Sequence, residues 1–253
     1  MRRSNTGFTL IEMITVIVIL SIISALGFGF VRSTLQSYNT TIDRGKLITK
    51  GRLALERMSR QLRAAVPNSV RVVGDCVEFL PIAGGGNYVV TVPDVANGMT
   101  ALATIATATH SVDFGTESYV VLGALNASEI YGASPASLEI LSSRSSTNLV
   151  LSAAKQWQRN SLNNRFFLAD QPQAFCVNSG NLRFQQSYSS GTYLTAAIPS
   201  SGGDIVVDGI GGHSFNVSNG TEDRNTTLTI AMTFTGGGEG VALNQEVYIR
   251  NVP

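Results

Sequence analysis

The sequence has few of the residues that build metal centres and redox sites. In 253 residues it contains two histidines, His110 and His213, and two cysteines, Cys76 and Cys176. A His- or Cys-rich metal centre needs several such ligands close together, so metallohydrolases and dithiol redox enzymes are disfavoured. We therefore predict neither a bound metal nor a cofactor.

A recognisable catalytic set is also missing. The sequence shows no Gly-X-Ser-X-Gly elbow, and we expect His110 in a Thr/Ala run and His213 in a Gly-rich turn. Nucleophilic hydrolysis needs a base beside an activated Ser or Cys, so we predict no enzymatic activity.

Four acidic residues could bind Ca²⁺, but their spacing matches no EF-hand loop, and a solvated loop is the favoured interpretation. This group is Asp204, Asp208, Glu222 and Asp223.

Charge is scarce and almost balanced. The chain has 18 Lys and Arg against 17 Asp and Glu, and 14% of its residues are charged. Without an excess of positive charge it has no field to hold a polyanion, so we predict no nucleic-acid partner. The hydrophobic share of 43% supports a sizeable core, and 25 glycines indicate many short strands joined by loops.

One long apolar segment stands near the N-terminus. Residues 13–31 carry no charge, Arg2 and Arg3 precede them, and Arg32 follows. At about 1.5 Å per residue a helix of this length nearly crosses the roughly 30 Å hydrocarbon core of a bilayer. The positive leader predicts a cytoplasmic N-terminus and export of the remainder.

A secretory signal peptide is the alternative interpretation of this segment. Ala25-Leu26-Gly27 could pass for the small-residue cleavage site of such a peptide. Glu12 argues against it, because an ionised carboxylate among apolar residues costs about 2.5 to 3.5 kcal/mol on insertion and therefore needs a function. We favour a retained helix.

The residues around Glu12 resemble a known processing signal. Gly7-Phe8-Thr9-Leu10-Ile11-Glu12, after a basic leader and before an apolar helix, is similar to the signal of type IV pilins and type II secretion pseudopilins. The resemblance implies that a prepilin peptidase cleaves between Gly7 and Phe8, and that Phe8 is then N-methylated. It also implies that Glu12 acts in assembly by pairing with the terminal amine of another subunit.

The helix is predicted to continue beyond the membrane segment. Leu55, Met58, Leu62 and Ala65 recur at helical spacing and form one apolar stripe. Pro67 should end the helix at Val66, because proline lacks an amide donor and restricts the preceding residue. Glycines within this helix could bend or unwind it locally. They are Gly27, Gly29, Gly45 and Gly51.

After Pro67 the pattern changes to short β segments, which predicts an antiparallel sheet. Two hairpins are clear, one at 177–182 and one in which alternating apolar residues of 228–234 and 247–249 flank three glycines. Residues 100–109 are ambiguous between helix and loop. The other expected strands are 70–73, 76–80, 88–92, 119–122, 138–141, 149–151, 175–177, 182–184 and 205–207.

These segments predict an α+β fold, a long helix packed on an antiparallel sheet. We divide the chain into a leader (1–7), a membrane or filament-core helix (8–31), its amphipathic continuation (32–66) and a periplasmic β-rich domain (67–253). Cys76 and Cys176 lie in strand-like segments of that exported domain. We expect them to form a disulfide, the alternative being two separately buried thiols.

A finer resemblance involves four segments of the chain. Residues 56–58, 63–71, 76–82 and 245–253 are similar to minor pilins of the mannose-sensitive haemagglutinin (MSHA) pilus, whereas 96–165 resemble nothing we can place. The resemblance implies a non-enzymatic subunit of pilus biogenesis, in a priming or tip complex.

The implied partners are other pilins, bound through the N-terminal helix, the prepilin peptidase and the inner membrane. The implied location is a single pass of the inner membrane with the domain in the periplasm, and then the pilus. A minor pseudopilin of type II secretion and a free-standing membrane-anchored adhesin remain alternatives.

Overall fold

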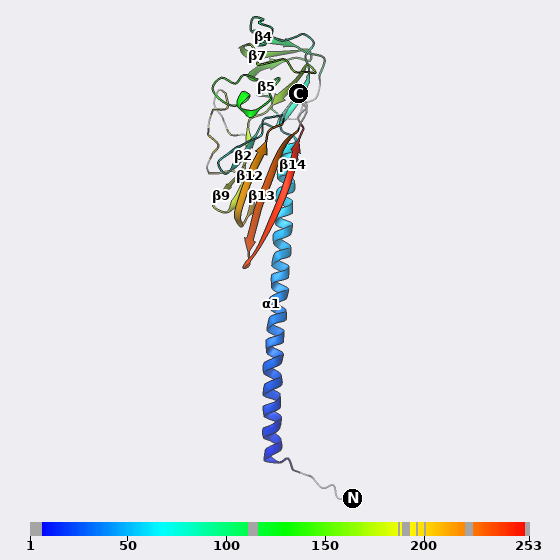
Figure 1. Cartoon of the computed structure of the whole chain (residues 1–253), viewed down its shortest axis with the longest axis vertical. Coiled ribbons are helices and arrows are strands. Elements are labelled where there is room, and N and C mark those ends of the chain that lie inside the picture. Colours follow the sequence, from blue (N-terminus) through cyan, green and yellow to red (C-terminus); the bar gives the residue numbers. More distant parts are fainter. Residues whose placement is uncertain are drawn as a thin grey trace.

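The chain folds into one long N-terminal helix and a β-rich domain built around the far end of that helix (Figure 1). The computed structural model describes residues 7–110, 116–186, 188, 193–195, 197–199, 201–220 and 225–250. Helix α1 spans Leu10–Arg63, and the described strands form three antiparallel sheets. This confirms the predicted α+β architecture of a long helix packed on antiparallel strands.

Helix α1 is continuous over its whole length. It contains 54 residues and stays helical through all four glycines, so the local unwinding considered above does not occur. Each glycine weakens a helix by about 1 kcal/mol relative to alanine, which is too little to break a ladder of backbone hydrogen bonds supported on both sides.

The helix ends earlier than predicted, at Arg63 rather than at Val66. Ala65 N–H still reaches back to the Leu62 carbonyl at 3.2 Å, but Val66 N–H donates to the Leu80 carbonyl at 2.8 Å. Pairing with a neighbouring strand segment therefore draws the chain out of the helix before the proline can end it.

Two of the three sheets enclose the last third of α1. The first has the order β12, β13, β14 and the second the order β1, β2, β9, β10, β11. The first contains β12 (Ile210–Ser218), β13 (Thr226–Gly236) and β14 (Glu239–Ile249). The second contains β1 (Arg71–Val73), β2 (Cys76–Phe79), β9 (Gln173–Asn178), β10 (Asn181–Gln185) and β11 (Asp204–Asp208).

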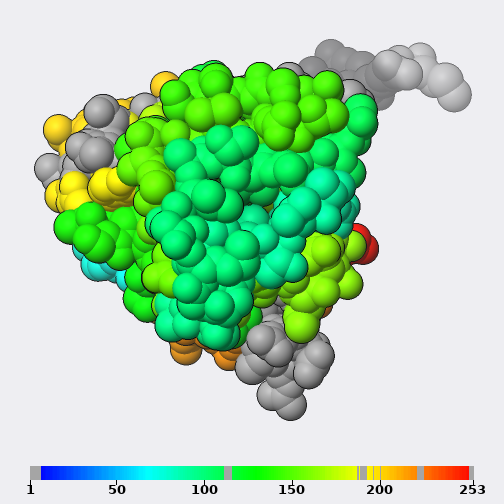
Figure 2. Space-filling view, turned by 90° about the horizontal axis from the view of Figure 1, so that it is seen from above, coloured from blue at the N-terminus to red at the C-terminus, as the bar shows by residue number. Residues whose placement is uncertain are grey.

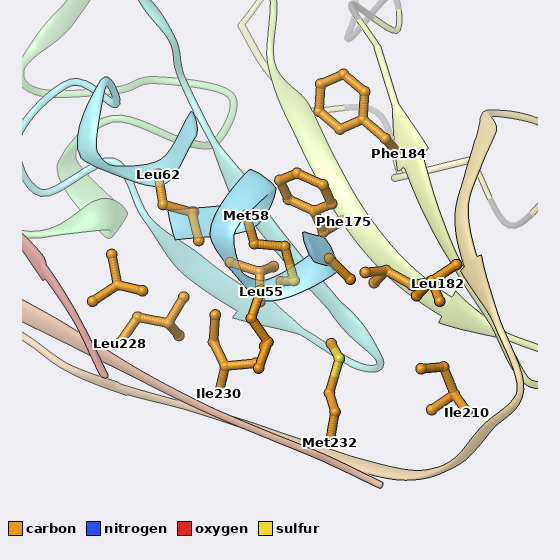
Figure 3. Packing of buried hydrophobic residues seen from close by; sticks show 14 of the residues in the cluster. Leu55, Met58, Leu62, Phe175, Leu182, Phe184, Ile210, Leu228, Ile230 and Met232 are labelled. Carbon is orange, nitrogen blue, oxygen red and sulfur yellow. The ribbon is translucent and has the colours of Figure 1, made fainter. Parts of the chain in front are cut away.

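The main hydrophobic core lies between these sheets, with the helix at its centre (Figure 3). Leu55, Met58 and Leu62 are buried, and Ala65 is buried just beyond the helix end, which confirms the predicted stripe. One sheet supplies Phe175, Leu182 and Phe184, and the other supplies Leu228, Ile230 and Met232.

Two glycines bring the helix and the β13–β14 hairpin into close contact. A Cβ added at Gly51 would lie 2.5 Å from Leu243 Cδ1 and 2.7 Å from Phe234 Cε2. At the hairpin turn Gly237 adopts φ +61°, and a Cβ there would lie 2.7 Å from the Asp43 carboxylate. The hairpin thus meets the helix from Asp43 onward, and the preceding part of α1 projects alone (Figure 1).

The third sheet forms the end of the molecule farthest from the N-terminus (Figures 1 and 2). Its six strands are, in order, β3 (Ile82–Asn87), β8 (Arg165–Ala169), β5 (Tyr119–Val121), β6 (Leu138–Arg144), β7 (Asn148–Lys155) and β4 (Leu102–Ala106). A bridge between Tyr88 and Thr107 joins the ends of the two edge strands, and Val89 N–H donates to the Ala106 carbonyl at 3.0 Å. The sheet therefore curls until its edges meet. A short 3-10 helix, η1 (Ala127–Glu129), lies between β5 and β6.

Several sequence expectations are wrong in this region. No strand lies at 88–92 as expected, and the strand in this part of the chain is β3, which ends at Asn87. Residues 100–109 contain strand β4 rather than a helix or loop. Strands β8 and β12 were not predicted, and His213 lies in β12 rather than in a turn. The glycines of β3 have a packing reason, because a Cβ at Gly86 would lie 3.0 Å from the ring of Phe166.

The two predicted hairpins and the disulfide are confirmed. Strands β13 and β14 pair from Gly236 and Glu239 outward, and β9 and β10 from Asn178 and Asn181. Cys76 lies directly opposite Cys176 on β2 and β9, and the structure joins them in a disulfide.

Candidate functional site

The residues of the processing signal stand free at the start of α1. Gly7 and Phe8 precede the helix, and residues 1–6 of the expected leader lie outside the described residues. A Cβ added at Gly7 would meet no heavy atom of residues 7–250 that the structure describes within 4 Å, and Phe8 is 72% exposed. The fold itself therefore requires neither a glycine at 7 nor an aromatic residue at 8, so any such requirement must come from another molecule.

Glu12 lies in the first turn of the helix. Thr9 is the N-cap residue, with an extended backbone and no side-chain capping hydrogen bond. The position suits a carboxylate, since the partial positive charge of a helix N-terminus stabilises anions. Within the described part of the chain no basic residue forms an ion pair with Glu12. A partner for this acid must be sought outside these residues.

The first half of α1 exposes apolar side chains on all its faces. The helix is long and apolar enough to cross a membrane, and the most apolar part of it has no buried residue. Exposure of such an apolar surface to water is unfavourable, so this part of the helix is suited to a lipid environment or to a bundle of other helices. Exposed side chains of this segment include Leu10, Ile14, Ile17, Leu20, Leu26 and Phe30.

Two hydroxyl groups within this segment bond to carbonyl groups of the helix itself. Thr15 Oγ1 donates to the Glu12 carbonyl at 3.0 Å, and Ser21 Oγ donates to the Val18 carbonyl at 2.8 Å. Such local bonds give both hydroxyl groups a partner when the helix enters hydrocarbon. The sequence analysis did not predict these bonds, although a Ser or Thr inside a predicted helix can donate to the carbonyl group three residues before it.

An ion pair fastens α1 to the edge of the second sheet. Lys50 on the helix contacts the Asp208 carboxylate on β11, and this hydrogen bond and charge lower the pKa of Asp208. Asp208 was one of the four residues considered for Ca²⁺, and Asp204 lies at the other end of the same strand. Glu222 and Asp223 lie outside the described residues.

The two histidines lie in different parts of the domain. His110 is buried against Phe166, and its Nδ1 lies 3.3 Å from Thr107 Oγ1. His213 Nε2 lies 3.2 Å from a carboxylate oxygen of the exposed Asp75. Among the described residues, no group of three or more His, Cys, Asp or Glu is arranged to hold a metal ion.

Comparison with known proteins places a defined motif on this helix. Residues 2–28 match the family model described as prokaryotic N-terminal methylation motif. Neither the curated proteins nor the solved structures gave a significant match. The matched residues include Gly7, Phe8 and Glu12 and most of the exposed apolar segment, but none of the β-rich domain. The motif indicates a type IV pilin-like or pseudopilin-like protein with an N-terminal helix able to anchor in a membrane.

Proposed function

We propose that the chain is a minor pilin of an MSHA-type pilus, similar to MshO, with a structural role in pilus biogenesis and no enzymatic activity. The observation that carries the proposal is the methylation motif at the start of a helix whose first half is exposed and apolar. Prepilin peptidase cleaves between Gly7 and Phe8, and Phe8 is N-methylated. The subunit then leaves the inner membrane for a priming or tip complex, with its domain in the periplasm.

The segments that resemble MSHA minor pilins support this choice. Residues 56–58 and 63–71 form the end of α1 and its exit, 76–82 include β2, and 245–249 lie in β14. Apart from Ile82, the first residue of β3, these residues belong to the part of the domain built around the helix. The six-stranded sheet, which takes strands β4, β5, β6 and β7 from the segment without a resemblance, lies at the far end (Figure 1).

Glu12 gives the assembly step its chemistry. Hydrolysis of the bond after Gly7 releases an amine at Phe8. In the proposed assembly step this amine forms an ion pair with Glu12 of a neighbouring subunit. Displacement of the neighbour by one helical turn, about 5.4 Å, would leave both charges unpaired in an apolar medium. Because an unpaired buried ion is strongly destabilising, the pair fixes the register between helices.

The test is Glu12→Ala in the full chain, expressed in cells that carry the other pilins. The variant should insert and be cleaved, because the substitution lowers the cost of membrane insertion, but it should no longer co-purify with other pilins from membranes. Asp204→Ala is the matched control, since it removes an exposed carboxylate far from the motif.

Three results would contradict parts of the proposal. Unchanged recovery of partners with Glu12→Ala would mean that Glu12 reaches the membrane interface and contributes little to assembly. Type II secretion pseudopilins among the wild-type partners would favour the pseudopilin alternative. A chain that retains residues 1–7 and joins no other pilin would favour a free-standing adhesin.

A further inference from the structure

An open groove runs between α1 and strand β14. Its volume is about 700 Å³, and β13 contributes no residue to its lining. The groove therefore lies on the side of β14 that faces away from β13. Its polar lining consists mainly of Arg52, Ser59, Arg60 and Arg63 from the helix and Asn244 and Gln245 from the strand.

Strand β14 presents a long edge to this groove. Within the described part of the chain it pairs with β13 alone, over 11 residues. In an antiparallel strand every second residue directs its N–H and C=O groups away from its partner. Proteins usually protect such edges with charged side chains, above all lysine, or with proline. Strand β14 contains no lysine or proline, and its charged residues are Glu239 and Glu246. The six-stranded sheet, by contrast, brings its edges together through Tyr88 and Thr107.

The helix side of the groove carries unpaired positive charge. Arg52, Arg60 and Arg63 are exposed, and none of them forms an ion pair in the part of the chain that the structure describes. Glu56 is the acidic residue among those lining the groove. Some arginines elsewhere do form ion pairs, as Arg159 does with Glu129. The groove is thus complementary to an acidic occupant.

Ser59 adds an independent sign of a missing occupant. It lines the groove and is 7% exposed, and its buried hydroxyl oxygen has no hydrogen-bond partner among the described residues. A buried hydroxyl without a partner destabilises the free protein. An occupant that offers a carboxylate or carbonyl oxygen could satisfy this hydroxyl after rotation about χ1.

We propose that the groove binds an extended segment of another protein chain, which adds as a fourth strand to β14 and carries acidic side chains. Strand addition would pair the outward backbone groups of β14, and the acids would face the arginines of α1. Glu246 is exposed on the face of β14 turned away from the helix. An acidic residue directly opposite Glu246 on the added strand would be repelled. The segment should therefore alternate acidic with neutral residues. The surface belongs to the folded domain, so this inference does not depend on the proposed role in a pilus.

The experiment measures binding of a dye-labelled synthetic peptide, in which Glu and Thr alternate, to the full chain in detergent. The peptide should bind at low salt and more weakly as salt is added. Arg60→Glu should weaken binding about fivefold, since it replaces an attraction by a repulsion at an exposed site. Arg44→Glu is the matched control, because it reverses an exposed charge of the same helix outside the groove and should leave binding unchanged.

Two further peptides separate strand addition from charge attraction alone. A peptide alternating Lys and Thr should bind at least about tenfold more weakly. The Glu/Thr peptide with alternate backbone amides N-methylated keeps its charge but cannot pair with an edge, and it should lose binding.

Four results would overturn the proposal. The first is an equal effect of Arg60→Glu and Arg44→Glu on binding of the Glu/Thr peptide. The second and third are binding of the Lys/Thr peptide, or of the N-methylated peptide, as tight as that of the Glu/Thr peptide. The fourth is a dimer of the chain that the Glu/Thr peptide does not dissociate. The last result would assign the edge to a second copy of this chain. Because the assay uses purified protein and peptides, its failure would leave the processing and co-purification tests of the proposed function unaffected.

Discussion

Replacement of Gly51 by alanine tests how closely α1 packs on the β13–β14 hairpin. The added Cβ would lie 2.5 Å from Leu243 Cδ1 and 2.7 Å from Phe234 Cε2. The Leu243 methyl group can rotate away, but the Phe234 ring is fully buried and cannot move without disturbing its neighbours. Gly45 of the same helix is the matched control, because a Cβ there would meet no heavy atom within 4 Å.

Two opposing effects set the magnitude. Alanine stabilises a helix by about 1 kcal/mol relative to glycine, and this gain applies at both positions. At Gly51 the extra methyl group also overpacks the core, which typically costs about 1–3 kcal/mol. We therefore expect Gly45→Ala to raise the free energy of unfolding by about 1 kcal/mol and Gly51→Ala to lower it by about 1 kcal/mol.

Urea denaturation of the full chain in detergent, followed by far-ultraviolet circular dichroism, would measure both variants. Fluorescence of Trp157, the single tryptophan and a core residue of the six-stranded sheet, reports whether that sheet unfolds together with the helix. Equal stabilisation by the two substitutions would refute the reasoning, since it would show that no side chain stands close to Gly51.

Three further predictions concern processing, the disulfide and pH. Gly7→Leu should leave the leader attached, as seen by intact mass, with the unfolding midpoint unchanged, because no atom lies within 4 Å of the added Cβ. Reduction of Cys76–Cys176 should lower that midpoint, since the bond closes a loop with a sequence separation of 100 and such a loop is worth about 4.7 kcal/mol; freely alkylated thiols in a non-reducing peptide map would contradict it. Burial raises the pKa of Glu129, but hydrogen bonds and the charge of Arg159 outweigh it and hold that pKa below 4.5. Its stabilising contribution is therefore present above about pH 4.5 and lost as the pH falls through the lowered pKa, so Glu129→Gln should flatten the acid side of the stability profile.

The parts of the fold that the sequence predicts are those with local causes. The stripe of Leu55, Met58 and Leu62 repeats at helical spacing, and the β13–β14 hairpin has alternating residues around a glycine turn. The disulfide was found because both cysteines lie in strand-like segments. In each case neighbouring residues alone carry the pattern.

The missed elements have non-local causes. Strand β3 contains three glycines, a pattern that predicts a loop. Their place in a strand is explained by the packing of Phe166, which is distant in sequence. Strand β4 reads as an ambiguous Ala/Thr stretch, and its pairing with β7 becomes apparent only once the sheet closes. The early end of α1 likewise depends on Leu80, which is distant in sequence but lies beside the chain after Arg63.

The same division holds for the functional residues. Gly7, Phe8 and Glu12 were identified because their motif is contiguous, and the family comparison matches that segment. Nothing in the sequence places the charged residues of 52–63 beside the free edge of β14. The unpartnered hydroxyl of Ser59 likewise becomes apparent only when the two elements are seen together.

The length of the β13–β14 hairpin decides how much of α1 remains outside the domain. The hairpin turn contacts the helix at Asp43, and burial of helix residues begins at Leu47. Residues 10–42 therefore project by about 50 Å, which exceeds the roughly 30 Å hydrocarbon core of a membrane. The excess corresponds to residues 32–42, which begin at Arg32 and are rich in Ser, Thr, Gln and Asn. In a membrane-anchored subunit this polar segment would hold the domain about 16 Å from the bilayer. That distance leaves the groove beside β14 accessible to a partner while the subunit is still in the membrane.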